Sequence, residues 1–240
     1  MMSRYTNHPD WYYKYYDKVF SKEKNYYYEI EQIDAIVSLA GKKVQEVGSG
    51  TGEHAIRILA KNPSYLELLD FNRKAINILE GRFKEKNNVK ILYENGFGDT
   101  VDGIFDVVIC MYSIIVQSIE TFEELENRLK TIFRRIRKGG YLFFETIDYD
   151  ICKTIYKEGS QSNIYKNAND EVIIKTEYSE NKINFIYSGK LDNQKISYKV
   201  SLFNLNKKQL LDFFTLNNIS DNGFISLDKS NRRQLIFARI

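Results

Sequence analysis

Short apolar runs alternate with amphipathic helical patterns over the first 150 residues of the chain. Runs typical of buried strands lie at 44–47, 65–70, 89–93, 104–111 and 141–146. Apolar residues at helical spacing predict amphipathic helices at 24–40, from 55 onwards, at 75–83 and at 122–137. Strands that alternate with helices are typical of an open, mainly parallel sheet covered on both faces.

A different pattern follows residue 147. Residues 148–170 are polar, and we expect them to be irregular. Residues 171–203 alternate apolar and polar positions, which predicts antiparallel strands with one solvated face. The remaining elements that we expect are a helix at 206–217 and two final strands at 224–227 and 234–240. The predicted fold is therefore α/β, a doubly wound seven-stranded sheet with a small antiparallel insert after strand five.

This pattern divides the chain into three parts. Residues 1–40 are crowded with tyrosines and are expected to form a helical lid, although the same aromatics could simply pack a helix onto the sheet. Residues 41–147 and 204–240 are expected to form the core. Residues 148–203 are the insert, which would serve as a substrate wall or as the surface of a homodimer.

Composition narrows the classes of protein that need consideration. A chain of 240 residues fits one large α/β domain, and its net charge of +3 is too small to indicate a nucleic-acid partner. No apolar run approaches the ~20 residues of a membrane span, and the N-terminus is unlike a signal peptide, so we expect a cytoplasmic protein. The two cysteines, Cys110 and Cys152, suggest neither a disulfide nor a metal site.

Three glycines follow the first predicted strand at every second position. Gly48, Gly50 and Gly52 are preceded by an acidic residue, Glu46. Glycine allows positive φ and lets a ligand approach the backbone, and the helix that follows offers unpaired N–H groups. The spacing differs from the G-x-G-x-x-G of dinucleotide sites, and the chain has no G-K-[ST] phosphate loop.

Two further strand ends carry polar side chains. Asp70 ends the second predicted strand, twenty-two residues after Gly48, where a carboxylate is suited to accept hydrogen bonds from the two hydroxyls of a ribose. Asp70 could equally cap the next helix, and both roles are compatible. Tyr112, Ser113 and Gln117 follow the clearest buried strand, at the edge where open α/β sheets bind ligands.

The E-x-G-x-G-x-G sequence after a strand resembles motif I of the class I S-adenosylmethionine (SAM)-dependent methyltransferases, and the K-G-G turn at 138–140 before strand five fits the same pattern. The resemblance covers nearly the whole chain and implies SAM as the cofactor. Where many members have an Asp and an apolar residue, this chain has Asn95-Gly96-Phe97, in which Asn95 would bind the adenine amino group and Phe97 would cover the ring. The expected cofactor-binding residues are Tyr16, Tyr26, Glu46, Gly48, Ser49, Gly50, Thr51, Gly52, Asp70, Phe71, Asn95, Gly96, Phe97, Cys110, Met111 and Tyr112.

Within this class the chain is similar to small N-methyltransferases that dimethylate the amino groups of nucleotide-linked deoxysugars. The similar features are Tyr16-Asp17, Tyr26 with Glu29, G-T-G-E-H-A at 50–55 and S-L-F-N-L-N-K-K-Q-L at 201–210. Phe20 departs from the pattern, because those enzymes have an aromatic hydroxyl there.

The resemblance implies methyl transfer to a small polar acceptor, with nitrogen favoured over oxygen. Tyr112, Tyr16 and His54 are the candidate catalytic residues, and Glu145 is a further group that could assist deprotonation. The alternatives are an O-methyltransferase of a small metabolite and a SAM- or nucleotide-binding protein without catalysis.

Overall fold

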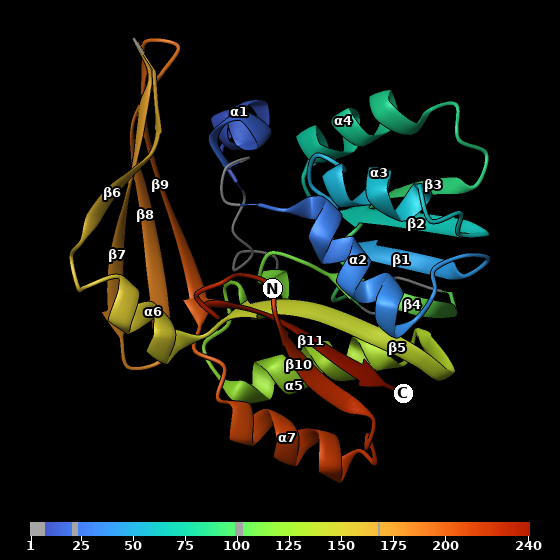
Figure 1. The fold of residues 1–240 in the computed structure, drawn as a ribbon. Helices are drawn as coiled ribbons and strands as arrows, with labels where there is room; N and C mark the ends of the chain where they lie inside the picture. Colours follow the sequence, from blue (N-terminus) through green and yellow to red (C-terminus); the bar gives the residue numbers. More distant parts are fainter. Residues whose placement is uncertain (1–7, 21–23, 99–102, 168) are drawn as a thin grey trace.

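The computed structural model describes residues 8–20, 24–98, 103–167 and 169–240, and its centre is a seven-stranded sheet (Figure 1). Its strand order is β10-β11-β5-β4-β1-β2-β3. The strands are β1 (Lys43–Val47), β2 (Tyr65–Asp70), β3 (Val89–Tyr93), β4 (Phe105–Cys110), β5 (Ile136–Ile147), β10 (Asn222–Ser226) and β11 (Arg233–Arg239). Strands β1 to β5 are mutually parallel, whereas β11 is antiparallel to β5 and β10. The predicted doubly wound sheet is confirmed.

Helices cover both faces of this sheet (Figure 1). One face packs against α2 (Tyr26–Ile36), α3 (Glu53–Leu59) and α4 (Arg73–Phe83), and the other packs against α5 (Phe122–Phe133) and α7 (Lys207–Leu216). Strand β4 contributes Val107 and Ile109 to one hydrophobic core and Val108 and Cys110 to the other. Because successive strand residues point to opposite faces, a strand covered on both sides is apolar throughout.

The insert forms a second, four-stranded antiparallel sheet beside the core. It contains β6 (Gln161–Lys166), β7 (Glu171–Ser179), β8 (Lys182–Leu191) and β9 (Gln194–Phe203), preceded by the short helix α6 (Tyr149–Ile155). The prediction that 148–170 is irregular was wrong. Asp148 caps α6 by accepting a hydrogen bond from the Ile151 N–H, and β6 pairs with β7 although its own sequence is mostly polar.

The N-terminal helix α1 (Asp10–Phe20) belongs to the segment expected to form a helical lid, although only the helix at 24–40 was predicted with bounds. Helix α1 lies between the insert and the core (Figure 1). Its aromatic residues gave no clear helical period, but Tyr15, Val19 and Phe20 are buried in the core that the insert shares. The predicted helix at 24–40 was too long, because Val37 is extended and α2 ends at Ile36. The helix predicted at 122–137 likewise ends earlier, at Phe133.

The K-G-G sequence is a bulge within β5 and not a turn before it, so that expectation was wrong. Phe105 pairs with Ile136, but Val107 pairs with Tyr141, so the four residues 137–140 of β5 lie opposite the single residue Asp106 of β4. A Cβ on Gly140 would lie 2.7 Å from the Asp106 carbonyl oxygen, so the close approach of the two strands requires glycine there.

The order of the strands reverses at β1, which lies between β2 and β4. The loop that carries the three glycines, residues 48–52 (the glycine loop), follows β1, and the 3₁₀ turn η1 (Ile114–Val116) lies shortly after β4. Loops at such a switch point diverge and leave a crevice at the carboxyl ends of the strands. In the described ranges, no helix has the length and apolarity needed to cross a membrane.

Candidate active site

The glycine loop borders a cavity of about 220 Å³. Gly48, Gly50 and Gly52 have φ values of 73°, 54° and 86°, a region that favours glycine. A Cβ on Gly52 would lie 2.8 Å from the side chains of Leu79 and Phe83, so this glycine lets α3 pack closely on α4. A Cβ on Gly50 would meet no atom within 4 Å, and Gly50 lines the cavity. The bare backbone at Gly50 therefore faces space that a ligand can fill.

Asp70 anchors this loop from the end of β2. One carboxylate oxygen accepts the Gly50 N–H at 2.9 Å, and the other accepts the Asn72 N–H at 2.8 Å. Burial raises the pKa of Asp70 to about 6, although the backbone N–H groups of Asn72, Gly50 and Phe71 act in the opposite direction. Asp70 is thus a buried carboxylate at the cavity surface that is ionised above pH about 6.

A smaller cavity adjoins the first and shares Gly48, Asp70 and Phe71 with it. Asn95, Gly96 and Phe97 line it, and the Asn95 side-chain oxygen accepts the Phe97 N–H at 3.1 Å. This local bond fixes the turn, and the same oxygen retains a second lone pair.

Two arginine side chains contact this turn and stabilise it. The guanidinium of Arg135, just beyond α5, donates to the Gly96 carbonyl. That of Arg128, within α5, lies 4.6 Å from the centre of the Phe97 ring. The end of α5 thereby fixes the wall of the smaller cavity.

Tyr112 follows β4 and is held at both ends by carboxylates. Its φ of 54° is unusual for a residue other than glycine. Its N–H donates to Glu145 at 2.7 Å, and its hydroxyl donates to Glu29 at 3.1 Å. Burial, and then the charge of Glu29, raise the pKa of Tyr112 far above its ordinary value. The Tyr112 hydroxyl is therefore fixed in its neutral form.

Arg233 of β11 joins the two carboxylates that hold Tyr112. Its side-chain nitrogens lie 2.7 Å from Glu29 and 2.7 Å from Glu145, and its side chain is only 8% exposed. Burial alone would raise the pKa of Glu29, but its contacts with His54 and Arg233 lower it to about 2. Such a buried cluster is tolerable only because each charge has a partner.

His54, in the first turn of α3, lies between two glutamates. Its Nε2 is 2.7 Å from Glu29, and its Nδ1 is 3.6 Å from Glu46. Burial raises the pKa of Glu46 to about 8. His54 therefore links helix α2 to the residue that precedes the glycine loop.

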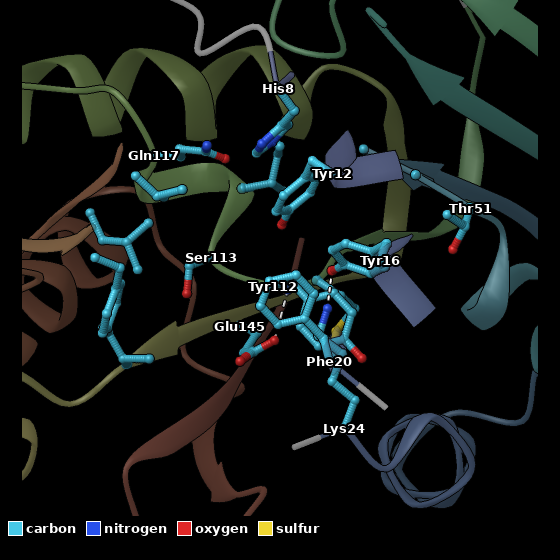
Figure 2. A pocket seen from close by; sticks show the side chains of 18 of the residues that line it. His8, Tyr12, Tyr16, Phe20, Lys24, Thr51, Tyr112, Ser113, Gln117 and Glu145 are labelled. Atoms are coloured by element: carbon cyan, nitrogen blue, oxygen red, sulfur yellow. Dashed lines mark hydrogen bonds between the residues drawn. The ribbon is translucent and has the colours of Figure 1, made fainter. Parts of the chain in front are cut away.

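The rings of Tyr16, Phe20 and Tyr112 surround an amine (Figure 2). The Lys24 Nζ is hydrogen-bonded to the Tyr16 hydroxyl and lies 3.7 Å from the centre of the Tyr112 ring. Tyr26 packs its ring edge-on against His54 at 5.1 Å, and its hydroxyl lies 3.5 Å from Asp17. These aromatics line the same cavity as the glycine loop.

The inner face of the insert closes the cavity on the far side. The side chains that β7, β8 and β9 contribute to the lining are Ile174, Thr176, Phe185, Tyr187, Val200 and Leu202. One continuous cavity therefore runs from the glycine loop and Asp70 to the wall of the insert.

Most of the residues predicted for the cofactor site lie around these two cavities. Of these, Tyr16, Tyr26, Gly48, Ser49, Gly50, Thr51, Asp70, Phe71, Met111 and Tyr112 line the main cavity, as does the candidate catalytic residue His54. Three others lie behind the lining. Glu46 contacts the lining residue His54, Gly52 packs against α4, and Cys110 is buried in the core. The contact of each residue with a cofactor stays a prediction.

Three cationic residues that line the cavity had no role predicted from the sequence. Lys24 precedes α2, Arg232 directly precedes β11, and Arg233 begins it. Glu29 was noted only as part of a resemblance, although it precedes Ile33 by one helical turn and so falls on the apolar stripe of its helix. This position of a charged residue on an apolar stripe is the signal in the sequence that indicates a buried ion pair.

A glycine loop and a buried carboxylate at the switch point of a doubly wound sheet define the class: the fold is that of the Rossmann-like, class I SAM-dependent methyltransferases. A family model described as "Methyltransferase domain" matches residues 23–207, well over half of the chain. The chain belongs to this family and contains a methyltransferase domain.

Solved structures agree on the fold. A SAM-dependent methyltransferase from Clostridium acetobutylicum superposes with a TM-score of 0.78 at 13% identity, over 96% of this chain and 98% of that one. An amino pentose methyltransferase of calicheamicin biosynthesis from Micromonospora echinaspora gives a TM-score of 0.73 at 15% identity, over 97% and 99% of the two chains.

Among curated proteins, the chain is similar to a ubiquinone biosynthesis O-methyltransferase from Cupriavidus pinatubonensis. The two are 28% identical over 123 residues, which cover 50% of this chain and 47% of that enzyme. The chain thus spans about half the length, or less, of the curated relatives it matches.

Proposed function

We propose that the protein transfers the methyl group of SAM to an amine of a small acceptor. One observation carries this proposal: a single cavity joins the glycine loop and Asp70 to the inner wall of the insert. A cofactor held at the sheet edge and an acceptor held against the insert would then meet inside the cavity. Holding two reactants in an aligned, close geometry is the main task of the protein when the cofactor is already activated.

The residues at the sheet edge fit SAM. The open space at the Gly50 Cβ position would accept the methionine part, and the Asp70 carboxylate would accept hydrogen bonds from the ribose. Asn95 and Phe97 would bind the adenine in the smaller cavity. When bound, SAM supplies a methyl group on a positively charged sulfur. This sulfur is a good leaving group, so the methyl group is already activated for transfer.

The candidate catalytic residues are better suited to positioning than to proton transfer. The Tyr112 hydroxyl donates to Glu29, and the Tyr16 hydroxyl bonds Lys24. Burial raises the pKa of both tyrosines well above the ordinary value, so neither is a good base. His54 Nε2 is engaged by Glu29. We infer that Tyr16, His54 and Tyr112 shape the cavity and hold the reactants in place.

An amine suits this cavity better than a hydroxyl group. An amine that enters without its proton needs no strong base, and a buried site favours that neutral form. The resemblance to sugar N-methyltransferases and the similarity to the amino pentose enzyme point in the same direction. O-methylation is the second candidate, because the ubiquinone biosynthesis relative is an O-methyltransferase.

The assay that tests this proposal follows S-adenosylhomocysteine in the purified protein with SAM and a panel of amines and alcohols. We expect its release to depend on an added amine, with a matching mass increase on that amine. Release that depends only on alcohols or phenols would favour O-methylation. Tight SAM binding without turnover of any acceptor would favour a binding protein instead.

The pH dependence of SAM binding tests the role of Asp70. Its pKa of about 6 lies above the ordinary 3.8, so the carboxylate is lost as the pH falls through about 6. We expect calorimetric titration to show SAM binding that weakens between pH 8 and pH 5. In Asp70→Asn, SAM should bind about 1–3 kcal/mol more weakly at pH 8, and the slope in this pH range should flatten. An unchanged slope in the variant would place the ribose contact on another residue.

A further inference from the structure

The ammonium group of Lys24 lies in a cage of aromatic rings (Figure 2). Its Nζ is 3.5 Å from the centre of the Tyr16 ring, 3.7 Å from that of Tyr112 and 5.2 Å from that of Phe20. Within the described parts of the chain, Lys24 forms no salt bridge. Several aromatic faces around one cation are the arrangement by which proteins recognise alkylammonium ligands. Here a side chain of the protein itself fills the cage.

The cage continues directly into the wall of the insert. The Phe20 ring meets the Tyr187 ring edge-on at 5.6 Å, so helix α1 and strand β8 form one surface. Beyond this contact the lining of the insert is mostly apolar: Ile164, Ile174, Phe185, Val200 and Leu202, with Ser162 and Thr176 as its polar members. An acceptor with its nitrogen in the cage would therefore lay its body on an apolar surface, where burying it is favourable.

The cations of this cavity are poorly placed to hold a diphosphate. Lys24, Arg232 and Arg233 are the lysine and arginine side chains among its described lining residues. Arg233 lies between Glu29 and Glu145, and Arg232 contacts Asp228 and the Tyr156 hydroxyl. A diphosphate would have to compete with these carboxylates and would meet their negative charge. A charged nucleotide body is therefore a poor match for this cavity.

We propose that the acceptor is an amine with an uncharged, apolar body, whose nitrogen takes the place of the Lys24 ammonium in the Tyr16–Phe20–Tyr112 cage while its body lies on the inner face of the insert. This inference rests on the proposed function and narrows its substrate class. It disfavours nucleotide-linked sugars as acceptors for this chain.

The same surroundings prepare an amine for attack. Burial, and then the charge of Arg233, lower the pKa of Lys24 to about 7, against the opposing charges of Glu145, Glu29 and Asp17. Desolvation also favours the neutral form of an acceptor amine that enters the cage. The neutral amine carries the lone pair that methylation requires, without a dedicated base.

A three-acceptor comparison tests the substrate class: phenylethylamine, ethanolamine and a thymidine-diphosphate amino sugar. We expect phenylethylamine to have a kcat/KM at least about tenfold above the other two. A higher value for ethanolamine or for the sugar nucleotide overturns this inference and leaves the proposed amine methylation intact. Turnover of none of the three contradicts the proposed function itself, and this inference with it.

Two isoleucines on β7 provide a matched test of the wall. Ile174 lines the cavity, whereas Ile173 points to the opposite face of the sheet. We expect Ile174→Asn to raise the KM for phenylethylamine about tenfold with unchanged SAM affinity, and Ile173→Asn to leave both values unchanged. Equal effects of the two substitutions would show that the acceptor does not touch this wall.

Binding of benzyltrimethylammonium tests the cage without turnover. This probe carries a permanent cation and an apolar body. In Lys24→Met the competing ammonium is gone, so calorimetry should show the probe binding about tenfold more tightly than in the wild type. Phe20→Leu should weaken binding in the Lys24→Met background. Unchanged or weaker probe binding in Lys24→Met overturns the assignment of the cage.

Discussion

Replacement of Gly50 by valine is expected to abolish cofactor binding while the protein stays folded. The Gly50 Cβ position faces the open space of the cavity, so the valine side chain would fill the volume assigned to SAM. We expect the affinity for SAM and for S-adenosylhomocysteine, measured by calorimetry, to fall on the order of 100-fold or more. The φ of 54° adds a folding cost of about 1–3 kcal/mol, because valine strains in this region.

Gly41 offers a matched control for that backbone strain. Its φ is 70°, a Cβ there also meets no atom within 4 Å, and it lies outside the cavity lining. Gly41→Val should lose a similar amount of stability in urea titrations but should bind SAM normally. If the two variants bind SAM equally well, the methionine part of the cofactor lies elsewhere.

Replacement of Arg233 by glutamine is expected to lower the free energy of unfolding by ~3–5 kcal/mol, because Glu29 and Glu145 lose their shared cation inside the protein. The measurement is a urea titration at pH 7. The neighbouring Arg232, whose side chain is 20% exposed and pairs with Asp228, is the control, and Arg232→Gln should cost about 1 kcal/mol or less.

The difference in the free energy of unfolding between the wild type and Arg233→Gln should depend on pH with a defined sign. The pKa of Glu29 is lowered from 4.5 to about 2, so its ion pairs stabilise the folded protein fully above pH 4.5. That stabilisation is lost as the pH falls from 4.5 towards 2. The gap between wild type and Arg233→Gln should therefore narrow over that range. A gap that is constant with pH would show that the loss comes from packing alone.

The parts of the fold that sequence could predict are those in which local pattern and final environment agree. Strands β2 and β3 were predicted with the bounds they have, because each is a short apolar run bounded by turn residues. Helix α1 was not predicted as a separate helix within the helical segment 1–40, and strand β6 was missed. Their sequences are rich in tyrosine or polar residues, and they become regular because they pack against or pair with distant segments.

Contacts between distant segments also limit what the sequence can predict about the site. The glycine loop and Tyr112 follow strands and Asp70 ends one, so sequence alone could predict their place at the sheet edge. The contact of Arg233 with Glu29 joins residues 204 positions apart, and no local pattern encodes it. The Lys24 cage likewise combines residues from α1, the segment before α2 and the loop after β4. Only the assembled fold shows which lone charges meet.

The link between Glu29 and Arg233 has a consequence for how the protein is made. A ribosome releases helix α2 long before strand β11, so Glu29 must wait for its cation while most of the chain is still being synthesised. Docking α2 early would leave Glu29 with only His54 and the Tyr112 hydroxyl as partners, without its arginine. The ion pairs of Arg233 with Glu29 and Glu145, beside the cavity, can therefore form only when β11 joins the sheet.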